Sequence, residues 1–272
     1  MLNAVLTFFA AMGTAYLGLV AMAWLFADAL MYPAPPPSYT DTPDQPKLPS
    51  PDGNKITAVF MENLQASHVL LFCHGNKQDL GTAEDRLRQY REHGWSVFAF
   101  DYPGYGTSTG APSEAGCYSA LASAYAYLTR IKGIPPEKIV LYGHSLGAGS
   151  AVDLASREPV GGLIVEGAFL SAFRVVTRWR MLPWDRFDNI SKIGRVRAPL
   201  LSIHAKEDHT VPFIHGRLLN EAHHGPKQHL WVENAGHNNI LEVAAPDYWD
   251  ALERFRLSLV FTQPPASLAS SP

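Results

Sequence analysis

The five residues Gly143-His144-Ser145-Leu146-Gly147 decide the fold that we expect for this chain. They follow an apolar run, residues 139–142, that is typical of a buried strand, and they precede a small-residue segment, 148–155, that is typical of a helix. A glycine on each side of the serine permits a very sharp turn, which exposes the serine hydroxyl at the amino end of the helix. The pattern predicts a nucleophilic serine at position 145. The alternative is a glycine-rich turn in which the serine only caps the helix.

Strand-like and helix-like segments alternate on both sides of this turn. The expected strands are residues 55–62, 67–73, 95–100, 138–142, 161–166, 199–204 and 228–233. The expected helices are residues 82–92, 114–131, 145–157, 214–222 and 239–259. This alternation predicts one α/β domain, residues 54–262, with a mostly parallel central sheet, helices on both faces and a short cap at about 170–198. Ligands of such sheets bind at the carboxyl ends of the strands, so we expect the functional groups in the loops there.

Two of these loops supply partners for Ser145. A serine hydroxyl needs a neighbouring base, and an imidazole base needs a carboxylate that fixes its tautomer. Asp208 and His237 follow expected strands, and the chain order serine, aspartate, histidine is the order found in this type of domain. Glu207 is the alternative acid. The alternative histidines are His204, which we interpret as an interior residue, and His209, His215, His223, His224 and His229.

Two backbone N–H groups are expected to form an oxyanion hole, those of Leu146 and Asn76. Asn76 ends the loop His74-Gly75-Asn76, whose glycine lets the backbone approach a substrate; the alternative is an ordinary glycine turn. We expect the substrate pocket to include His74, Gly75, Tyr102 and His144. No spacing of histidines and cysteines matches a zinc site, and the chemistry requires no cofactor, so we expect neither a metal nor a cofactor.

Residues 2–27 contain no charged side chain, and as a helix they would extend about 39 Å at about 1.5 Å per residue, enough to cross a bilayer. We therefore interpret residues 1–32 as a retained transmembrane anchor. The alternatives are a signal peptide cleaved near Ala27-Asp28-Ala29, which would give a secreted or periplasmic protein, or a helix packed on the domain. The proline-rich residues 33–53 are expected to form an extended spacer, and residues 263–272 a disordered tail.

Charge and cysteine content limit the possible partners and the possible disulfides. The chain has 272 residues and a formal net charge of -3 with interspersed charges, and no basic run indicates a nucleic-acid partner. Its two cysteines, Cys73 and Cys117, are too few for a disulfide framework. We expect two buried thiols, with a single bridge as the alternative. The sequence leaves the oligomeric state and the side of the membrane open.

Taken together, the motifs resemble those of the α/β-hydrolases. More narrowly, they are similar to those of small α/β-hydrolase domain-containing proteins related to the prolyl-oligopeptidase clan, a group that includes membrane-associated acyl-protein thioesterases. The resemblance covers about residues 50–245. The motifs that carry it, in order, are His74-Gly75-Asn76, Asp101-Tyr102-Pro103-Gly104-Tyr105-Gly106, Gly143-His144-Ser145-Leu146-Gly147, Asp208 ahead of Val211-Pro212, and Gly236-His237-Asn238.

The chain departs from this family's pattern in two places. Lys77-Gln78-Asp79 follow the His-Gly-Asn loop where the family has small residues, and the apolar segment replaces the cysteine-rich, lipidated N-terminus of some thioesterases. The resemblance implies a membrane-associated serine hydrolase that cleaves esters or thioesters, with lipids or lipidated molecules as candidate substrates. The alternatives are a peptidase or amidase, or a membrane-tethered binding module without catalysis.

Overall fold

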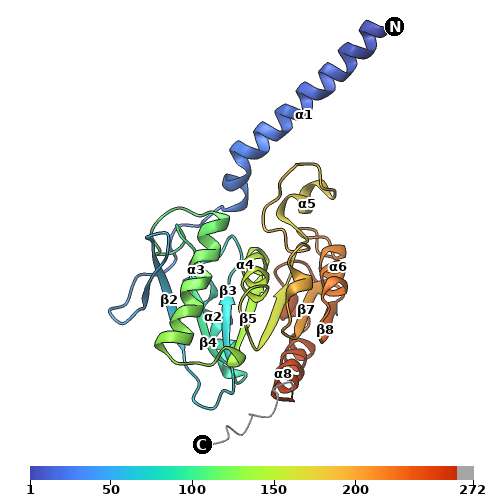
Figure 1. Ribbon diagram of the computed structural model, residues 1–272. Helices are drawn as coiled ribbons and strands as arrows, with labels where there is room; N and C mark the ends of the chain where they lie inside the picture. Colours follow the sequence, from blue (N-terminus) through green and yellow to red (C-terminus); the bar gives the residue numbers. More distant parts are fainter. Residues whose placement is uncertain (262–272) are drawn as a thin grey trace, which may run out of the picture.

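The computed structural model describes residues 1–261 as an α/β domain from which one long helix projects (Figure 1). That helix, α1 (Leu2–Met31), is followed by an irregular segment that leads into the sheet. The N-terminal apolar helix and the α/β domain that the sequence predicts are therefore both present. The expected tail, 263–272, lies outside the described residues.

An eight-stranded sheet forms the centre of the domain, in the order β1-β2-β4-β3-β5-β6-β7-β8. The strands are β1 (Lys47–Pro49), β2 (Lys55–Met61), β3 (Val69–Cys73), β4 (Ser96–Phe100), β5 (Ile139–His144), β6 (Gly162–Glu166), β7 (Leu200–Ala205) and β8 (Lys227–Val232). β1 and β2 run antiparallel to their neighbours, whereas the six strands from β4 to β8 in the sheet are parallel to one another. The sheet is thus mostly parallel, as expected.

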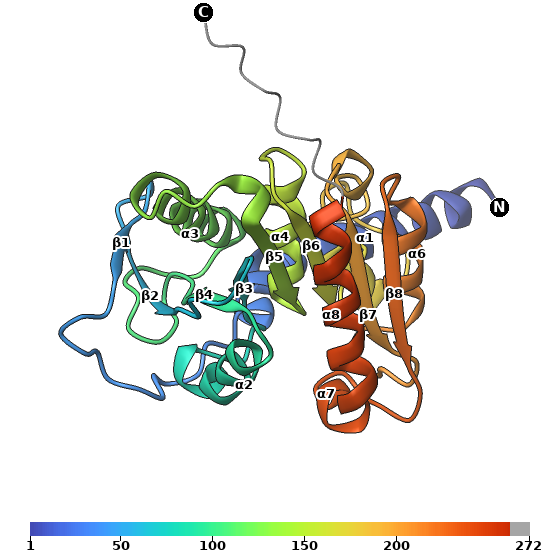
Figure 2. The ribbon, with the colours of Figure 1, turned by 90° about the horizontal axis from the view of Figure 1, so that it is seen from below.

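Helices cover both faces of the sheet. The larger ones are α2 (Leu80–Glu92), α3 (Glu114–Ala126), α4 (Leu146–Ala155), α6 (Ile214–Ala222) and α8 (Ala245–Phe261). Side chains of α3, α4 and α6 join one hydrophobic cluster, and those of α2 and α8 join another, so that α3 and α4 lie across the sheet from α2 and α8 (Figure 2). Along β3, Leu71 and Cys73 belong to the first cluster and Leu70 and Phe72 to the second, because successive strand residues point to opposite faces.

Two of the expected helices are divided in the structure. The helix expected at 114–131 continues from α3 as a single π-helical turn, Tyr127–Ile131, and the helix expected at 239–259 is two helices, α7 (Ile240–Val243) and α8. Pro246 explains this break, because proline donates no backbone hydrogen bond and is tolerated only in the first turn of a helix. The remaining short helices are Pro136–Lys138, α5 (Ala172–Thr177) and Ile193–Arg195.

Residues 33–53, which we expect to form an extended spacer, make several contacts with the domain. Residues 47–49 form the edge strand β1. The backbone N–H and the hydroxyl of Ser38 donate to the carboxylate of Asp79 at 2.7 and 2.5 Å, and the Tyr39 hydroxyl donates to Asp101 at 2.5 Å. Such contacts hold an otherwise extended chain against the amino end of α2.

A cluster of ionic and hydroxyl groups joins α2 and α8 on one face of the sheet. Arg86 of α2 lies 2.6 Å from the carboxylate of Glu166 at the end of β6, and the hydroxyl groups of Tyr142 and Tyr248 also donate to that carboxylate. Tyr90 completes the cluster through its hydroxyl, 2.6 Å from that of Tyr248. Burial alone would raise the pKa of Glu166, but the Arg86 guanidinium lowers it to about 2. Glu166 therefore stays ionised well into the acid range.

We expect Glu166→Gln to destabilise the domain by about 2–3 kcal/mol at neutral pH, because it removes the counter-ion of the Arg86 guanidinium, which is partly buried at the pocket wall. The pKa of Glu166 is lower in the folded chain than its ordinary value of 4.5, so its contribution is complete above pH 4.5 and is lost as the pH falls towards 2. Urea unfolding of the full chain in detergent should therefore show a wide gap between wild type and variant at pH 7 and a narrower gap at pH 3. Glu92→Gln, at an exposed position of α2, serves as the control and should match wild type at both pH values.

Candidate active site

Ser145 occupies the sharp turn between β5 and α4. Its backbone has φ = 52° and ψ = -115°, a strained conformation for a residue with a side chain. Gly147 allows the turn because a Cβ at this position would lie 2.1 Å from the carbonyl oxygen of Cys73. Gly143 is equally constrained, since its Cβ would lie 2.4 Å from Cα of Ala148. The turn thus requires glycine at both places, as the sequence pattern predicts.

The three residues expected to act together meet at the carboxyl edge of the sheet. The hydroxyl oxygen of Ser145 lies 2.8 Å from Nε2 of His237, and Nδ1 of His237 lies 2.6 Å from Oδ2 of Asp208. Because a carboxylate only accepts hydrogen bonds, Nδ1 carries the proton and Nε2 is the acceptor that faces the serine hydroxyl. The arrangement can transfer the serine proton to the imidazole.

Asp208 is held in its ionised form. The backbone N–H groups of Thr210 and Val211 donate to Oδ1 at 2.8 and 2.7 Å, and Nε2 of His204 lies 3.4 Å from Oδ2. Burial by itself raises the pKa of Asp208, but hydrogen bonds from His204, His237 and Val211 hold it well below the usual range. The negative charge beside His237 is therefore retained across the pH range in which an imidazole titrates.

Within the described residues, none of the alternative acids or histidines forms a hydrogen bond with Ser145. Glu207 and His209 are exposed, and His223 is buried with Nε2 3.0 Å from the carbonyl oxygen of Ala198. His204 is an interior residue, as interpreted from the sequence, with Nε2 2.9 Å from the carbonyl oxygen of Val211. Both cysteines are free and buried, and burial raises the pKa of their thiols.

The two expected oxyanion donors line one pocket with Ser145. Leu146 begins α4, so its N–H has no acceptor within the helix, and the described part of the chain offers no acceptor to the N–H of Asn76. The Tyr105 hydroxyl donates to the Asn76 carbonyl at 2.9 Å, and the Asn76 side-chain amide donates to the Met31 carbonyl at 3.0 Å. The loop that carries Asn76 is therefore fixed on two sides.

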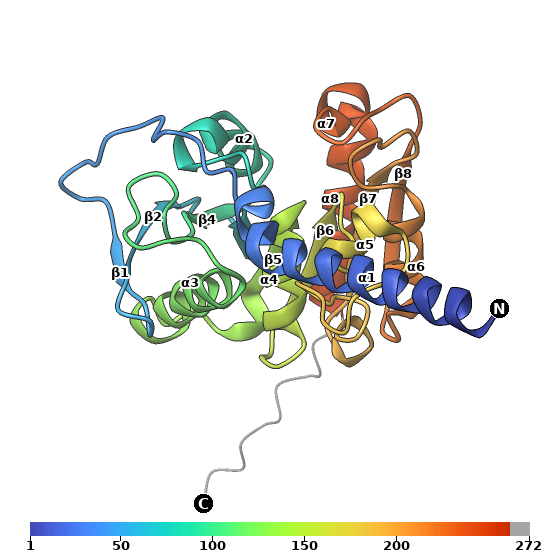
Figure 3. The same ribbon diagram turned by 90° about the horizontal axis from the view of Figure 1, so that it is seen from above.

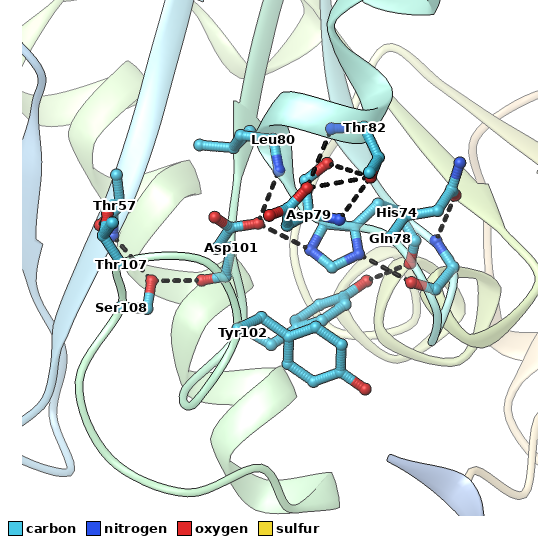
Figure 4. Close-up of polar contacts among 12 residues, drawn as sticks. Thr57, His74, Gln78, Asp79, Leu80, Thr82, Asp101, Tyr102, Thr107 and Ser108 are labelled. Carbon is cyan, nitrogen blue, oxygen red and sulfur yellow. Dashed lines mark hydrogen bonds and ion pairs between the residues drawn. The ribbon is translucent and has the colours of Figure 1, made fainter. Parts of the chain in front are cut away.

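His74 and Tyr102, which we expected in the pocket, are buried and are not among the residues that line it. Figure 4 shows them beside Asp101 and Gln78. Both are buried to 1% exposure or less, because the Tyr102 hydroxyl donates to the His74 carbonyl at 2.8 Å and the His74 imidazole packs on the Tyr102 ring. Nε2 of His74 lies 3.2 Å from the carboxylate of Asp101. These two residues support the loop that bears Asn76 rather than contact a substrate.

Gly75 and His144 do line the pocket. Nδ1 of His144 donates to the side-chain oxygen of Gln78 at 3.1 Å, and the Gly75 N–H donates to the same oxygen at 3.0 Å. Burial lowers the pKa of His144 to about 3, so its ring is neutral at physiological pH. His144 and Gln78 together hold the loop of residues 74–76 against the serine turn.

The pocket around Ser145 has a volume of about 420 Å³ and two kinds of wall. Leu146 and Phe169 belong to the hydrophobic cluster on the α3 and α4 face, and Met31 packs against it. Gln78 and Arg86 provide a polar wall on the side of the Arg86–Glu166 cluster. A molecule with an apolar part and a polar part fits such a pocket.

Sequence reasoning missed several residues of this site. Gly167 directly follows β6 with φ = 59°, and a Cβ there would lie 2.8 Å from Cε1 of His237. Its signal in the sequence is a glycine placed immediately after an expected strand. Arg86, Leu30 and Met31 also line the pocket, but they come from helices whose positions relative to Ser145 only the folded chain defines.

Comparison with known proteins assigns the chain to a family. Residues 70–199 match the Alpha/beta hydrolase family. The chain is 39% identical over 206 residues to Alpha/beta hydrolase domain-containing protein aho-3 of Caenorhabditis elegans, covering 74% of this chain and 61% of that protein. It is 36% identical over 192 residues to Alpha/beta hydrolase domain-containing protein 17B of Homo sapiens, covering 69% of this chain and 67% of the relative. The chain therefore spans only three fifths to two thirds of the length of these relatives.

Solved structures share the fold at low sequence identity. An esterase of Pyrococcus furiosus superimposes with a TM-score of 0.68 at 15% identity, covering 83% of this chain and 97% of that chain. Est1E of Butyrivibrio proteoclasticus, solved with ferulic acid bound, gives a TM-score of 0.64 at 16% identity, covering 79% and 99%. The fold, the sequence match and the relatives agree: the chain belongs to the alpha/beta hydrolase family, a family of hydrolytic enzymes.

Proposed function

We propose that this chain is a membrane-anchored serine hydrolase that cleaves carboxylic esters or thioesters through an acyl-enzyme on Ser145. One observation carries the proposal, the continuous hydrogen-bonded path from the Ser145 hydroxyl through His237 to the Asp208 carboxylate, at 2.8 and 2.6 Å. Solved structures of this fold that are named esterases support an ester substrate as the first class to test.

The reaction follows from the positions of these groups. His237 takes the serine proton at Nε2 while Ser145 Oγ attacks the acyl carbonyl, and Asp208 stabilises the imidazolium that forms. The N–H groups of Asn76 and Leu146 receive the negative charge on the former carbonyl oxygen. His237 then protonates the leaving alcohol or thiol, and an acyl-enzyme remains. A water molecule, deprotonated by His237, releases the carboxylic acid and restores Ser145.

Membrane anchoring rests on α1. Its residues from Leu2 to Phe26 lack charge and are almost all exposed, and 30 helical residues exceed the roughly 20 that a bilayer requires. The domain contacts mainly the last turn of α1 and leaves the apolar side chains before it almost all exposed, so these need another apolar environment. We propose that this environment is a lipid bilayer.

Replacement of Ser145 tests the nucleophile. Ser145→Ala should abolish hydrolysis of p-nitrophenyl butyrate and labelling by a fluorophosphonate probe, because no other hydroxyl lies at hydrogen-bonding distance from His237 within the described residues. Ser156→Ala, at the end of α4, should keep both activities. Undiminished labelling of the Ser145→Ala protein would exclude this serine as the nucleophile.

A second test exploits the contact between Gly167 and His237. In Gly167→Ala the new Cβ displaces the imidazole, and a displacement of about 1 Å at a reacting group costs about 10²-fold in kcat. Gly133→Ala is the matched control, since Gly133 has φ = 65° and nothing within 4 Å of the new Cβ, and it should change thermal stability alone. Equal kcat values for the two variants would contradict the role of His237 as the base.

The anchor is tested by extraction. The full chain, expressed in bacteria, should sediment with membranes and resist alkaline carbonate, because about 0.8 kcal/mol is lost for each buried methylene group that returns to water. Truncation before Asp28 should release the protein into the soluble fraction. Carbonate-soluble full-length protein would contradict the transmembrane assignment.

A further inference from the structure

The last turn of α1 reaches the substrate pocket. Leu30 and Met31 line the cavity that contains Ser145. Seen from above, α1 crosses the carboxyl edge of the sheet over β5 and α4 and extends past α5 (Figure 3). Val175 and Val176 of α5 line the same cavity. The helix proposed to hold the protein in a membrane thus ends as a wall of the proposed active site.

The end of α1 is fixed to the domain by several contacts. Tyr32 is buried to 6% exposure and packs edge-on against Phe187 at 6.4 Å between ring centroids. The carboxylate of Asp28 lies 3.6 Å from the Arg186 guanidinium. Together with the hydrogen bond from Asn76 to the Met31 carbonyl, these contacts set the last turn of α1 at a defined place beside Ser145.

The mouth of the pocket is apolar and exposed. Leu30 is 78% exposed and Val176 is 85% exposed, although they come from segments far apart in the sequence. Leu25, also exposed on α1, lies about 8 Å further along the helix at about 1.5 Å per residue. With residues from Leu2 to about Leu25 inside a bilayer, the mouth of the pocket lies at the bilayer surface.

The tip of the cap lies beside α1. The Tyr16 hydroxyl of α1 donates to the Met181 carbonyl at 3.1 Å, so the cap follows α1 away from the domain. Trp179, between Arg178 and Arg180 in the cap, is 76% exposed.

The two walls of the pocket give a bound substrate a direction. Met31 and Val175 pack against the hydrophobic cluster on the α3 and α4 face, and they present an apolar surface to the cavity. Lys77, Gln78 and Arg86 line the polar part. An acyl chain is therefore favoured along α1 and α5, and a polar leaving group along α2.

We propose that Leu30, Met31, Val175 and Val176 form an acyl-chain site that opens at the surface of the bilayer holding α1, so that the substrate is a long-chain ester or thioester resident in that bilayer. This inference rests on the proposed function, because it assumes that Ser145 attacks the acyl carbonyl. The acyl chain of the substrate leaves the lipid along α1, and its carbonyl group then reaches Ser145 without crossing water.

The test compares chain lengths in the full protein. Leu30→Glu and Val176→Glu place a carboxylate at the apolar mouth, and each should lower kcat/KM for p-nitrophenyl hexadecanoate in detergent micelles by about tenfold or more. The ratio of kcat/KM for the hexadecanoate ester to kcat/KM for p-nitrophenyl butyrate should fall by a similar factor, because only the long acyl chain is proposed to occupy the apolar mouth. Leu64→Glu is the control, because Leu64 is 90% exposed in the loop before β3, at the opposite edge of the sheet, and should change neither value.

A vesicle assay identifies which kind of molecule supplies the acyl chain. The wild-type protein in phosphatidylcholine vesicles should release hexadecanoate from a hexadecanoyl-glycerol ester or from an S-hexadecanoyl peptide in the same vesicles. Faster release from one of them identifies the substrate class as a lipid ester or as a peptide thioester. Release from neither, with butyrate hydrolysis intact, would overturn the acyl-site proposal and leave the Ser145 mechanism standing. An equal loss of kcat/KM for the butyrate and hexadecanoate esters in both glutamate variants, or no loss for either ester, would also overturn the acyl-site proposal. Absence of butyrate hydrolysis in wild type would instead refute the proposed function.

Discussion

The close contact between α4 and the end of β3 is the constraint on which the site depends. The backbone of Gly147 touches the Cys73 carbonyl, and this contact holds the amino end of α4 beside the loop that follows β3. Consequently the N–H of Leu146 and the N–H of Asn76 line one pocket, although they are 70 residues apart in the sequence. The strained backbone of Ser145 is tolerated because the surrounding β5 and α4 are buried and leave the turn no alternative path.

The parallel register supplies the second condition. In β5 and β6 the Cα partners are His144 and Glu166, and in β7 and β8 they are Ala205 and Val232, so the strands end at nearly the same level. Loops that start from a common edge can meet, and those bearing Ser145, Asp208 and His237 do. The Arg86–Glu166 pair strengthens this edge, since it joins α2 to the end of β6 one residue before Gly167, which contacts the His237 ring.

Much of this arrangement could be predicted from the sequence, for a physical reason. The glycines around Ser145 and the apolar strands 139–142 and 199–204 are local patterns, and they determine the class of the fold and the loops that carry functional groups. What the sequence did not reveal depends on packing across the chain. His74 and Tyr102 looked like pocket residues because they lie in the right loops, yet their side chains turn inward and hold those loops. The contacts of residues 33–53 with α2 were missed likewise, because a proline-rich composition indicates extended backbone and says nothing of what it touches.

The junction between α1 and the domain joins the proposed anchor to the proposed active site. A flexible tether would only raise the local concentration of the enzyme near its membrane, whereas the Asn76 amide on the Met31 carbonyl and the Asp28–Arg186 pair fix the direction in which the pocket opens. In the proposed arrangement this orientation reduces the entropic cost of bringing a membrane-resident acyl chain to Ser145, because the mouth of the pocket would already face the lipid. The same contacts make the loop of residues 74–76 sensitive to the position of α1, since the Asn76 side chain holds the Met31 turn and the Asn76 backbone N–H is the proposed oxyanion donor. The proposed anchor and the proposed catalytic site are then coupled through one residue rather than added to one another.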